Sequence, residues 1–253
     1  MKIEEIRHVR LMGCPIHVLN MQETIDLIDQ CIRMKRQIHH VVVNAAKLVH
    51  MQTDKELYDS VVACDIINAD GQSVVWASRF LGRALPERVA GVDLMVNLMK
   101  LAAEKGYRAF FFGAQEEITQ KVANIYTQQY GANVVAGYRN GYYQQEDEMA
   151  IALEIAASGA DLLFVAITSP KKEIFLNRYK HIINTPFIMG VGGTFDVISG
   201  KTKRAPTWMQ RNGLEWLYRI YQEPRRMWKR YAITNTKFIV MLLREKYLKS
   251  RVE

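Results

Sequence analysis

The chain has 253 residues, of which 49% are hydrophobic and 24% charged, and its formal net charge is +8. Such a length allows one large domain, or a domain with an appendage, in an ordinary folded protein. The longest apolar run near the C-terminus, residues 238–243, excludes a bilayer-spanning helix there, which needs about 20 residues. The charged N-terminus and three cysteines without CxxC spacing predict a cytoplasmic protein with reduced thiols and no zinc site.

Short β-branched or aromatic runs alternate along the chain with longer helical patterns. Helices are predicted at residues 21–35, 72–80, 92–104, 116–130 and 146–157. Strands are predicted at residues 39–43, 65–68, 108–113, 134–138, 161–167 and 187–191. Most of these strands are continuous apolar runs, which are typical of strands covered on both faces. The pattern predicts an α/β fold with a Rossmann-like, mostly parallel sheet flanked by helices.

Small residues stand at the ends of three of the predicted strands, at Gly113, at residues 167–170 and at residues 190–194. Glycine at a strand-to-helix turn lets the backbone approach a phosphate, and the next helix supplies free N–H donors. Each turn alone is weak evidence, because glycine also simply makes tight turns. The chain has neither GxGxxG with an acidic partner nor GxxxxGK[ST], so dehydrogenase and P-loop kinase functions lose their specific support.

One carboxylate, Asp70, lies at a predicted strand-to-helix turn on the edge of the sheet where ligands bind. It is a candidate general base, although spacing alone favours an ordinary N-cap aspartate before a turn glycine. The sequence contains no Asp-x-Asp, the usual carboxylate pair for a metal bound to a sugar diphosphate. No metal site is therefore expected, and arginine, lysine and backbone donors would have to meet the charge of a leaving diphosphate.

The basic excess lies entirely in the last fifth of the chain. Residues 201–253 hold 14 Lys and Arg against 4 Asp and Glu, and three of the four tryptophans. The pattern predicts a catalytic domain at residues 1–200 and a basic helical appendage at residues 201–253. Tryptophan with arginine suits a membrane interface, stacking on nucleic-acid bases, or packing of the appendage onto the sheet. A solvated helix face is the remaining interpretation of the charge.

Seven longer strings occur in one order along the chain. They are NADG (68–71), PERVAGVDL (86–94), SPKKE (169–173), GVGGTFD (190–196), KRAP (203–206), GLEWLYR (213–219) and QEPRR (222–226). Together they resemble the WecG/TagA/CpsF family, or glycosyltransferase family 26, from about residue 13 to residue 231. The ordered set is specific, although each string alone is weak.

The resemblance implies an inverting, metal-independent transferase without a cofactor. Its donor would be a UDP-sugar carrying N-acetylmannosamine, the corresponding uronic acid or a glucose-type sugar. Its acceptor would be a polyprenyl-diphosphate-linked sugar used for cell-surface polysaccharides. The enzyme would be cytoplasmic and peripheral on the inner face of the cell membrane, without nucleic acid as a partner.

On the acceptor side, the resemblance implies that Asp70 is the general base and that Asn44 and Arg88 contact the acceptor. The basic appendage would dock on the membrane and bring Arg219 and Arg226 to the diphosphate. From the residues alone, Asn44 could instead cap the next helix, and Arg88 could be a surface ion-pair residue.

On the donor side, the resemblance implies that Gly113 and Gly192 line the nucleotide cleft, with Tyr142 and Asp196 near the base. From the residues alone, Tyr142 could be a packed aromatic and Asp196 a helix-start acid. Lys172 stands where many members of the family have glutamine. This lysine could complement a carboxylate on the donor or another phosphate, or be a surface lysine at a helix start.

A second departure is Val42, which stands two residues before Asn44 where teichoic-acid members of the family carry a threonine. The two departures leave the predicted reaction class intact, but they do not support assigning the donor sugar of the teichoic-acid members to this chain. Two other classes of function stay open: a nucleic-acid-binding module that uses the Trp/Arg appendage, and a non-catalytic scaffold of a polysaccharide assembly complex. Lipid or self-association into a homo-oligomer could cover an apolar edge left by a detached appendage.

Overall fold

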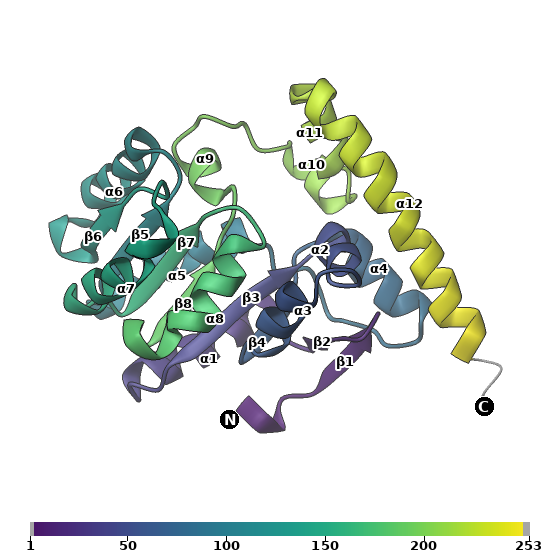
Figure 1. Ribbon diagram of the computed structural model, residues 1–253, viewed down its shortest axis with the longest axis horizontal. Helices are drawn as coiled ribbons and strands as arrows, with labels where there is room; N and C mark the ends of the chain where they lie inside the picture. Colours follow the sequence, from purple (N-terminus) through teal and green to yellow (C-terminus); the bar gives the residue numbers. More distant parts are fainter. Residues whose placement is uncertain (1–2, 250–253) are drawn as a thin grey trace.

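The structure is a computed structural model that describes residues 3–249, apart from the side chains of Glu4, Arg226, Leu248 and Lys249. Six parallel strands form the central sheet in the order β4-β3-β8-β7-β5-β6 (Figure 1). The strands are β3 (Ile38–Val43), β4 (Ile66–Ala69), β5 (Ala109–Gly113), β6 (Val135–Arg139), β7 (Leu162–Ala166) and β8 (Phe187–Gly190). All six match the predicted strands, and the predicted α/β, Rossmann-like sheet is confirmed.

Helices follow the strands and cover both faces of the sheet (Figure 1). They are α1 (Met21–Arg33), α2 (Ala45–His50), α3 (Lys55–Val62), α4 (Gln72–Phe80), α5 (Gly91–Lys105), α6 (Glu116–Tyr130), α7 (Glu148–Ala157), α8 (Lys171–Ile183) and α9 (Thr194–Ile198). Every residue of β5 is buried, because Phe111 packs with α5 and α6 while Phe110 and Phe112 pack with α7 and α8 on the opposite face. This two-sided burial explains the continuous apolar runs in the sequence.

A short antiparallel hairpin near the N-terminus was not predicted. Its strands are β1 (His8–Leu11) and β2 (Cys14–His17). The hairpin packs beside β4, where the backbone N–H of Ile67 donates to Nδ1 of His17 at 3.0 Å. Each strand has only four residues, so the alternation of apolar and polar positions is too short to predict it.

The last part of the chain is helical, as predicted. It forms α10 (Thr207–Arg211), α11 (Glu215–Gln222) and the long α12 (Pro224–Lys249), which runs along one side of the molecule beside α2 (Figure 1). Phe238 of α12 is 5% exposed and joins the core cluster of β1, β2, α2, α3 and α4. The carboxylate of Glu245 accepts hydrogen bonds from the Met12 N–H and from Arg83.

Among residues 3–249, no helix is both long and apolar enough to cross a membrane.

Candidate active site

The carboxyl ends of the six parallel strands lie at one edge of the sheet and carry five of the ten predicted site residues. Asn44 follows β3, Asp70 follows β4, Tyr142 follows β6, and Gly192 follows β8. Gly113 is the last residue of β5. The tertiary structure therefore gathers side chains that are widely separated in the chain, as expected for a parallel α/β sheet.

Asn44 and Asp70 lie side by side at the ends of β3 and β4. The Asp70 N–H donates to the Val43 carbonyl at 2.9 Å, which joins the two strand ends. Asn44 caps α2, because its side-chain oxygen accepts from the Lys47 N–H at 3.0 Å. The capping interpretation of Asn44 is thus confirmed, and it leaves the amide nitrogen available to a ligand.

Asp70 does not cap the helix that follows it, because Gly71 is the N-cap of α4 and that cap has no side-chain hydrogen bond. Its Oδ1 instead accepts the N–H of Gly91, the first residue of α5, at 3.3 Å. The N-cap interpretation favoured by spacing is therefore wrong for α4. Asp70 therefore lies between two helix N-termini, whose partial positive charge favours the ionised form that a general base requires.

The groups around Asp70 have opposite effects on the pKa of its carboxyl group. Burial raises the pKa of the Asp70 carboxyl above its ordinary value of 3.8, and the negative charge of Glu215 adds to this rise. The positive charges of Arg88 and Arg219 and the hydrogen bond from Gly91 lower the pKa, but they do not cancel the effect of burial. A raised pKa makes the carboxylate a stronger base toward a hydroxyl group.

Arg88 lies close to Asp70 and is not a surface residue, since only 13% of its side chain is exposed. The N–H of the next residue, Val89, donates to the carbonyl of Ala69 at 2.8 Å, so the segment is attached to the end of β4. Arg88 donates a hydrogen bond through Nη1 to the carboxylate of Glu215 on α11. The structure thus brings Asp70, Arg88 and the appendage together.

Lys172 is buried with 6% exposure, so its interpretation as a surface lysine is wrong. Its ammonium lies 3.0 Å from Oε1 of Glu173, and the Lys47 ammonium lies 2.8 Å from the same oxygen. Burial lowers the pKa of the Lys172 ammonium to about 8, and the Lys47 charge adds to this effect. Although burial opposes it, the two ammonium groups lower the pKa of Glu173 to about 2. The cluster carries a net positive charge at the ends of β3 and β7.

On the other half of the edge, the loops after β5 and β6 pass close to each other and to the end of β7. A Cβ at Gly113 would lie 2.5 Å from the carbonyl carbon of Ala166, and Gly113 has a φ of +127°. A Cβ at Gly141 would lie 2.9 Å from the Cα of Gly113. Only glycine fits Gly113 without moving the backbone, because both the space and the φ exclude a side chain.

A cavity of about 490 Å³ lies at the ends of β6 and β7. Its lining includes Gly141, Tyr142, Tyr143, Thr168 and Lys171. Tyr142 is 72% exposed, so its interpretation as a packed aromatic is wrong. Aromatic rings and an ammonium beside glycine turns suit a nucleotide, whose base stacks and whose phosphates are anionic.

Asp196 and Gly192 do not line this cavity. Asp196 stands in the first turn of α9, and its carboxylate lies 3.6 Å from the ammonium of Lys201. Lys201 also contacts the side chain of Gln115, just after β5, at 3.3 Å. Lys201 thus connects Asp196 to the end of β5, and the lining of the cavity beside Tyr142 does not include Asp196.

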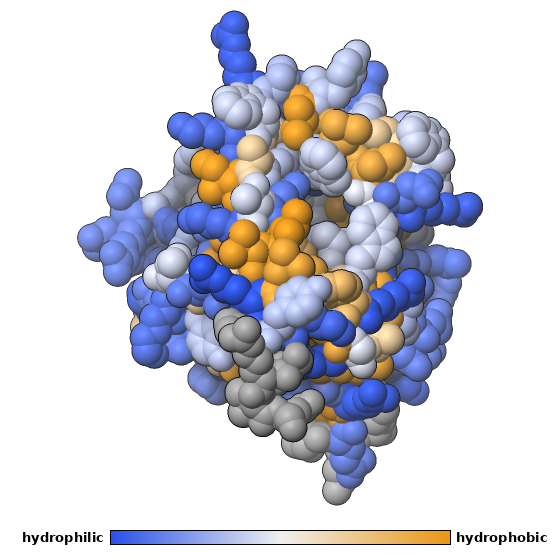
Figure 2. Space-filling model, turned by 90° about the vertical axis from the view of Figure 1, so that its right-hand side faces the viewer, coloured by the Kyte–Doolittle hydropathy of each residue, from blue (hydrophilic) through white to orange (hydrophobic). Residues whose placement is uncertain are grey.

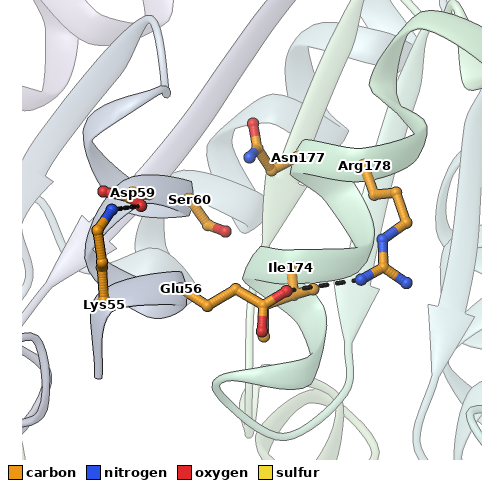
Figure 3. A pocket seen from close by; sticks show the side chains of 7 residues that line it. All are labelled: Lys55, Glu56, Asp59, Ser60, Ile174, Asn177 and Arg178. Carbon is orange, nitrogen blue, oxygen red and sulfur yellow. Dashed lines mark hydrogen bonds and ion pairs between the residues drawn. The ribbon is translucent and has the colours of Figure 1, made fainter. Parts of the chain in front are cut away.

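A second cavity, of about 480 Å³, lies between α3 and α8 (Figure 3). Its charged side chains pair with neighbours: Lys55 with Asp59, and Arg178 with Glu56 at 3.5 Å. Because these charges are already neutralised, the cavity is a weaker candidate site than the strand-end edge.

The appendage contributes one predicted residue to the site. Arg219 of α11 is exposed and lies close enough to Asp70 to lower its pKa. The side chain of Arg226 lies outside the part of the chain that the structure describes.

The appendage exposes aromatic and aliphatic side chains in a segment of the chain that is rich in basic residues. The face of the molecule on the side of α12 shows apolar patches bordered by hydrophilic side chains (Figure 2). Trp208 is 60%, Trp216 38% and Trp228 58% exposed, so packing of these tryptophans in the core is wrong. Other exposed apolar residues of this part of the chain are Leu217, Tyr221, Ile233, Ile239, Val240, Leu243 and Tyr247.

Glu215, Glu173 and Lys47 were missed by sequence reasoning as site residues. Glu215 and Glu173 stand inside the strings GLEWLYR and SPKKE. A lone acidic residue within a basic segment was the available signal, but it does not reveal which cation the acid contacts.

A buried carboxylate, a neighbouring arginine and a cavity lie at the strand ends of a parallel α/β sheet, the edge at which proteins of this fold class bind their ligands. The sequence model of the glycosyl transferase WecG/TagA/CpsF family matches residues 9–252, and the chain belongs to this family. The predicted resemblance is confirmed, and the protein is a glycosyltransferase.

Two relatives carry the name N-acetylglucosaminyldiphosphoundecaprenol N-acetyl-β-D-mannosaminyltransferase. The protein of Bacillus subtilis (strain 168) is 36% identical over 192 residues, which are 76% of this chain and 73% of the relative. The protein of Bacillus spizizenii (strain ATCC 23059 / NRRL B-14472 / W23) is 36% identical over 188 residues, which are 74% of this chain and 72% of the relative.

Proposed function

We propose that this glycosyltransferase moves N-acetylmannosamine from a UDP-sugar to N-acetylglucosamine on a polyprenyl diphosphate. The names of the two relatives support this acceptor and this sugar. The observation that carries the proposal is the position of Asp70, a carboxylate with a raised pKa, beside Arg88 at the strand-end edge. Membership of the family disfavours the nucleic-acid-binding module and the scaffold.

In the proposed reaction, Asp70 takes the proton of the acceptor hydroxyl, whose oxygen attacks the anomeric carbon of the donor. The bond from that carbon to the UDP oxygen breaks, so the configuration inverts and UDP leaves. Arg88, Arg219 and Arg226 bind the acceptor diphosphate, with Asn44 beside the acceptor sugar. Guanidinium groups suit this task because they bind phosphate oxygens in a bidentate manner.

The donor lies in the other half of the edge in this proposal. Gly113 and Gly192 allow the close approach of its diphosphate, Tyr142 contacts the uracil from the cavity, and Asp196 approaches the uracil from the α9 side. The net positive charge around Lys172 stabilises the leaving phosphate through the low-dielectric interior. No divalent metal is required in this scheme.

We propose further that residues 201–253 form a membrane-docking appendage and that the enzyme is peripheral on the inner face of the cell membrane. Exposed tryptophan and aliphatic side chains among basic residues support a lipid surface rather than self-association (Figure 2). Cosedimentation with anionic vesicles tests this point. Protein that sediments to the same extent with and without the vesicles would contradict it.

The function is tested by UDP release from a panel of UDP-sugars with a polyprenyl-diphosphate-N-acetylglucosamine analogue. The panel contains UDP-N-acetylmannosamine, its uronic acid, UDP-glucose and UDP-glucuronate. We expect that UDP release requires both substrates, continues when EDTA is added, and is lost in the Asp70→Asn variant. Folded protein that turns over no donor in the presence of membranes would contradict the proposal.

A further inference from the structure

The carboxylate of Glu215 connects the appendage to two other segments of the chain. Glu215 is the first residue of α11, and its Oε2 accepts the hydrogen bond from Nη1 of Arg88. Its Oε1 lies 3.8 Å from Nε of Arg204, which belongs to the connection before α10. One tail carboxylate therefore contacts two guanidinium groups.

The backbone around Arg88 is attached to the sheet independently of this contact. Val89 is fully buried, and its N–H is hydrogen-bonded to Ala69, the residue before Asp70. Among the described residues, Glu215 is the only hydrogen-bond partner of the Arg88 guanidinium. The direction of that guanidinium beside Asp70 therefore depends on Glu215.

Glu215 is itself held in place on its other side. The guanidinium of Arg204 binds both carboxylate oxygens of Asp93, at 2.5 and 2.7 Å. Asp93 lies in the first turn of α5, whose position is set by its burial against the sheet. A bidentate pair of this kind has a defined geometry, so Glu215 meets a cation with a fixed orientation.

We propose that Glu215 is a positioning residue of the active site, which orients the Arg88 guanidinium beside Asp70. The inference rests on the proposed function, because Arg88 and Asp70 take their roles from it. Glu215 acts through Arg88 and does not contact the reacting atoms.

The proposal predicts a change in rate when the Glu215 charge is removed. A charge-assisted hydrogen bond that orients a binding group contributes enough that Glu215→Gln should lower kcat/KM for the acceptor by about 10- to 100-fold. The amide keeps the size of the side chain, so a loss of packing does not explain such an effect.

The pH dependence of kcat supplies a readout that a purely structural role would not change. Asp70 is faced by Arg88 from the loop before α5, by the Gly91 N–H, by Arg204 from the connection before α10, and by Glu215 and Arg219 from α11. Arg88 lowers the pKa of Asp70 more than Glu215 raises it, so a Glu215→Gln substitution that lets Arg88 move away should raise the pKa, and the acid limb of the profile should move to higher pH. A shift of the acid limb to lower pH would mean that Glu215 acts on Asp70 by its own charge alone, and it would overturn the positioning role.

A double-mutant cycle on the full chain isolates the contact between the two side chains. It uses Arg88→Ala, Glu215→Gln and the double variant with UDP-N-acetylmannosamine and the acceptor analogue. If Glu215 acts through Arg88, Glu215→Gln should cost less than about twofold once Arg88 is absent. An equal loss in both backgrounds would overturn the proposal, as would a faster reaction with a lower acceptor KM in Glu215→Gln. Glu117→Gln, an exposed acid on α6, is the matched control.

Hydrogen–deuterium exchange tests the same contact without activity. In Glu215→Gln, the backbone amides of residues 86–90 and 215–222 should exchange faster than in the wild type. Unchanged exchange in both segments would overturn the role of Glu215 whatever the activity. Faster exchange together with no wild-type turnover would support the contact and contradict the proposed function instead.

Discussion

The ammonium nitrogen of Lys47 lies 2.8 Å from Oε1 of Glu173, and both side chains are almost fully buried. Lys47 belongs to α2 after β3, and Glu173 belongs to α8 after β7, so the ion pair ties two strand ends together at the site. Lys172 lies 3.0 Å from the same oxygen, while Oε2 of Glu173 has no hydrogen-bond partner. One carboxylate thus compensates two buried ammonium groups.

Glu173→Gln should destabilise the fold strongly, because it leaves the charges of Lys47 and Lys172 uncompensated in the interior. Removal of one partner from a buried ion pair costs about 3–5 kcal/mol. Urea unfolding followed by circular dichroism measures the loss, with Glu117→Gln as the exposed control. An equal unfolding midpoint for the two variants would refute the stabilising role of the cluster.

The same carboxylate should make stability depend on pH in acid. The pKa of Glu173 is about 2 in the fold and 4.5 ordinarily, so the unfolded chain binds the proton first. The stabilisation is present above pH 4.5 and is lost as the pH falls from 4.5 toward 2. The difference in unfolding free energy between wild type and Glu173→Gln should therefore shrink over this range.

Asp70 should set the acid limb of the transfer reaction. The base acts as the carboxylate, and burial raises its pKa, so kcat should fall with decreasing pH at a point above 3.8. Asp70→Asn should lower kcat by about 10²- to 10⁴-fold without unfolding the protein. The exposed Asp26→Asn is the control. Full activity of Asp70→Asn would exclude Asp70 as the base.

Gly113→Ala should destabilise the end of β5, since its φ of +127° is unfavourable for alanine and the new Cβ would meet the backbone of Ala166. We expect a loss of at least about 2 kcal/mol in unfolding free energy and weaker UDP binding by calorimetry. Gly193→Ala is matched to it, because Gly193 has a φ of −76° and open space at its Cβ. Equal effects of the two substitutions would contradict the strain argument.

Phe238→Ala should loosen α12, because Phe238 is 5% exposed and is the member of this helix inside the core cluster, with Met241 and Leu242 packed beside it. A buried phenylalanine truncated to alanine costs about 3–5 kcal/mol, so exchange of the α12 amides should rise. Ile239→Ala, at a position with 54% exposure, should leave exchange unchanged. Protection that survives in Phe238→Ala would show that other contacts hold the helix.

Local patterns predicted most of the fold. The apolar runs around Phe111 and Phe164 read as covered strands, and the helical periods of α5 and α6 were visible in the sequence. The hairpin of β1 and β2 was missed because four-residue strands are too short for a period to emerge. Asp70 was placed correctly at the strand-end edge, but its contact with Gly91 rather than with α4 was not predictable.

By itself the sequence determined the α/β class, the family, the basic appendage and the strand-end position of the candidate residues. These properties depend on periodicity and on ordered strings, which are local in the chain. Only the tertiary structure decided that Lys172 is buried, that the tryptophans are exposed, and which charges meet. Arg88 and Glu215 are 127 residues apart and Lys47 and Glu173 are 126 apart, so only the folded chain specifies their pairing. Such contacts depend on how separate elements pack, which no local pattern encodes.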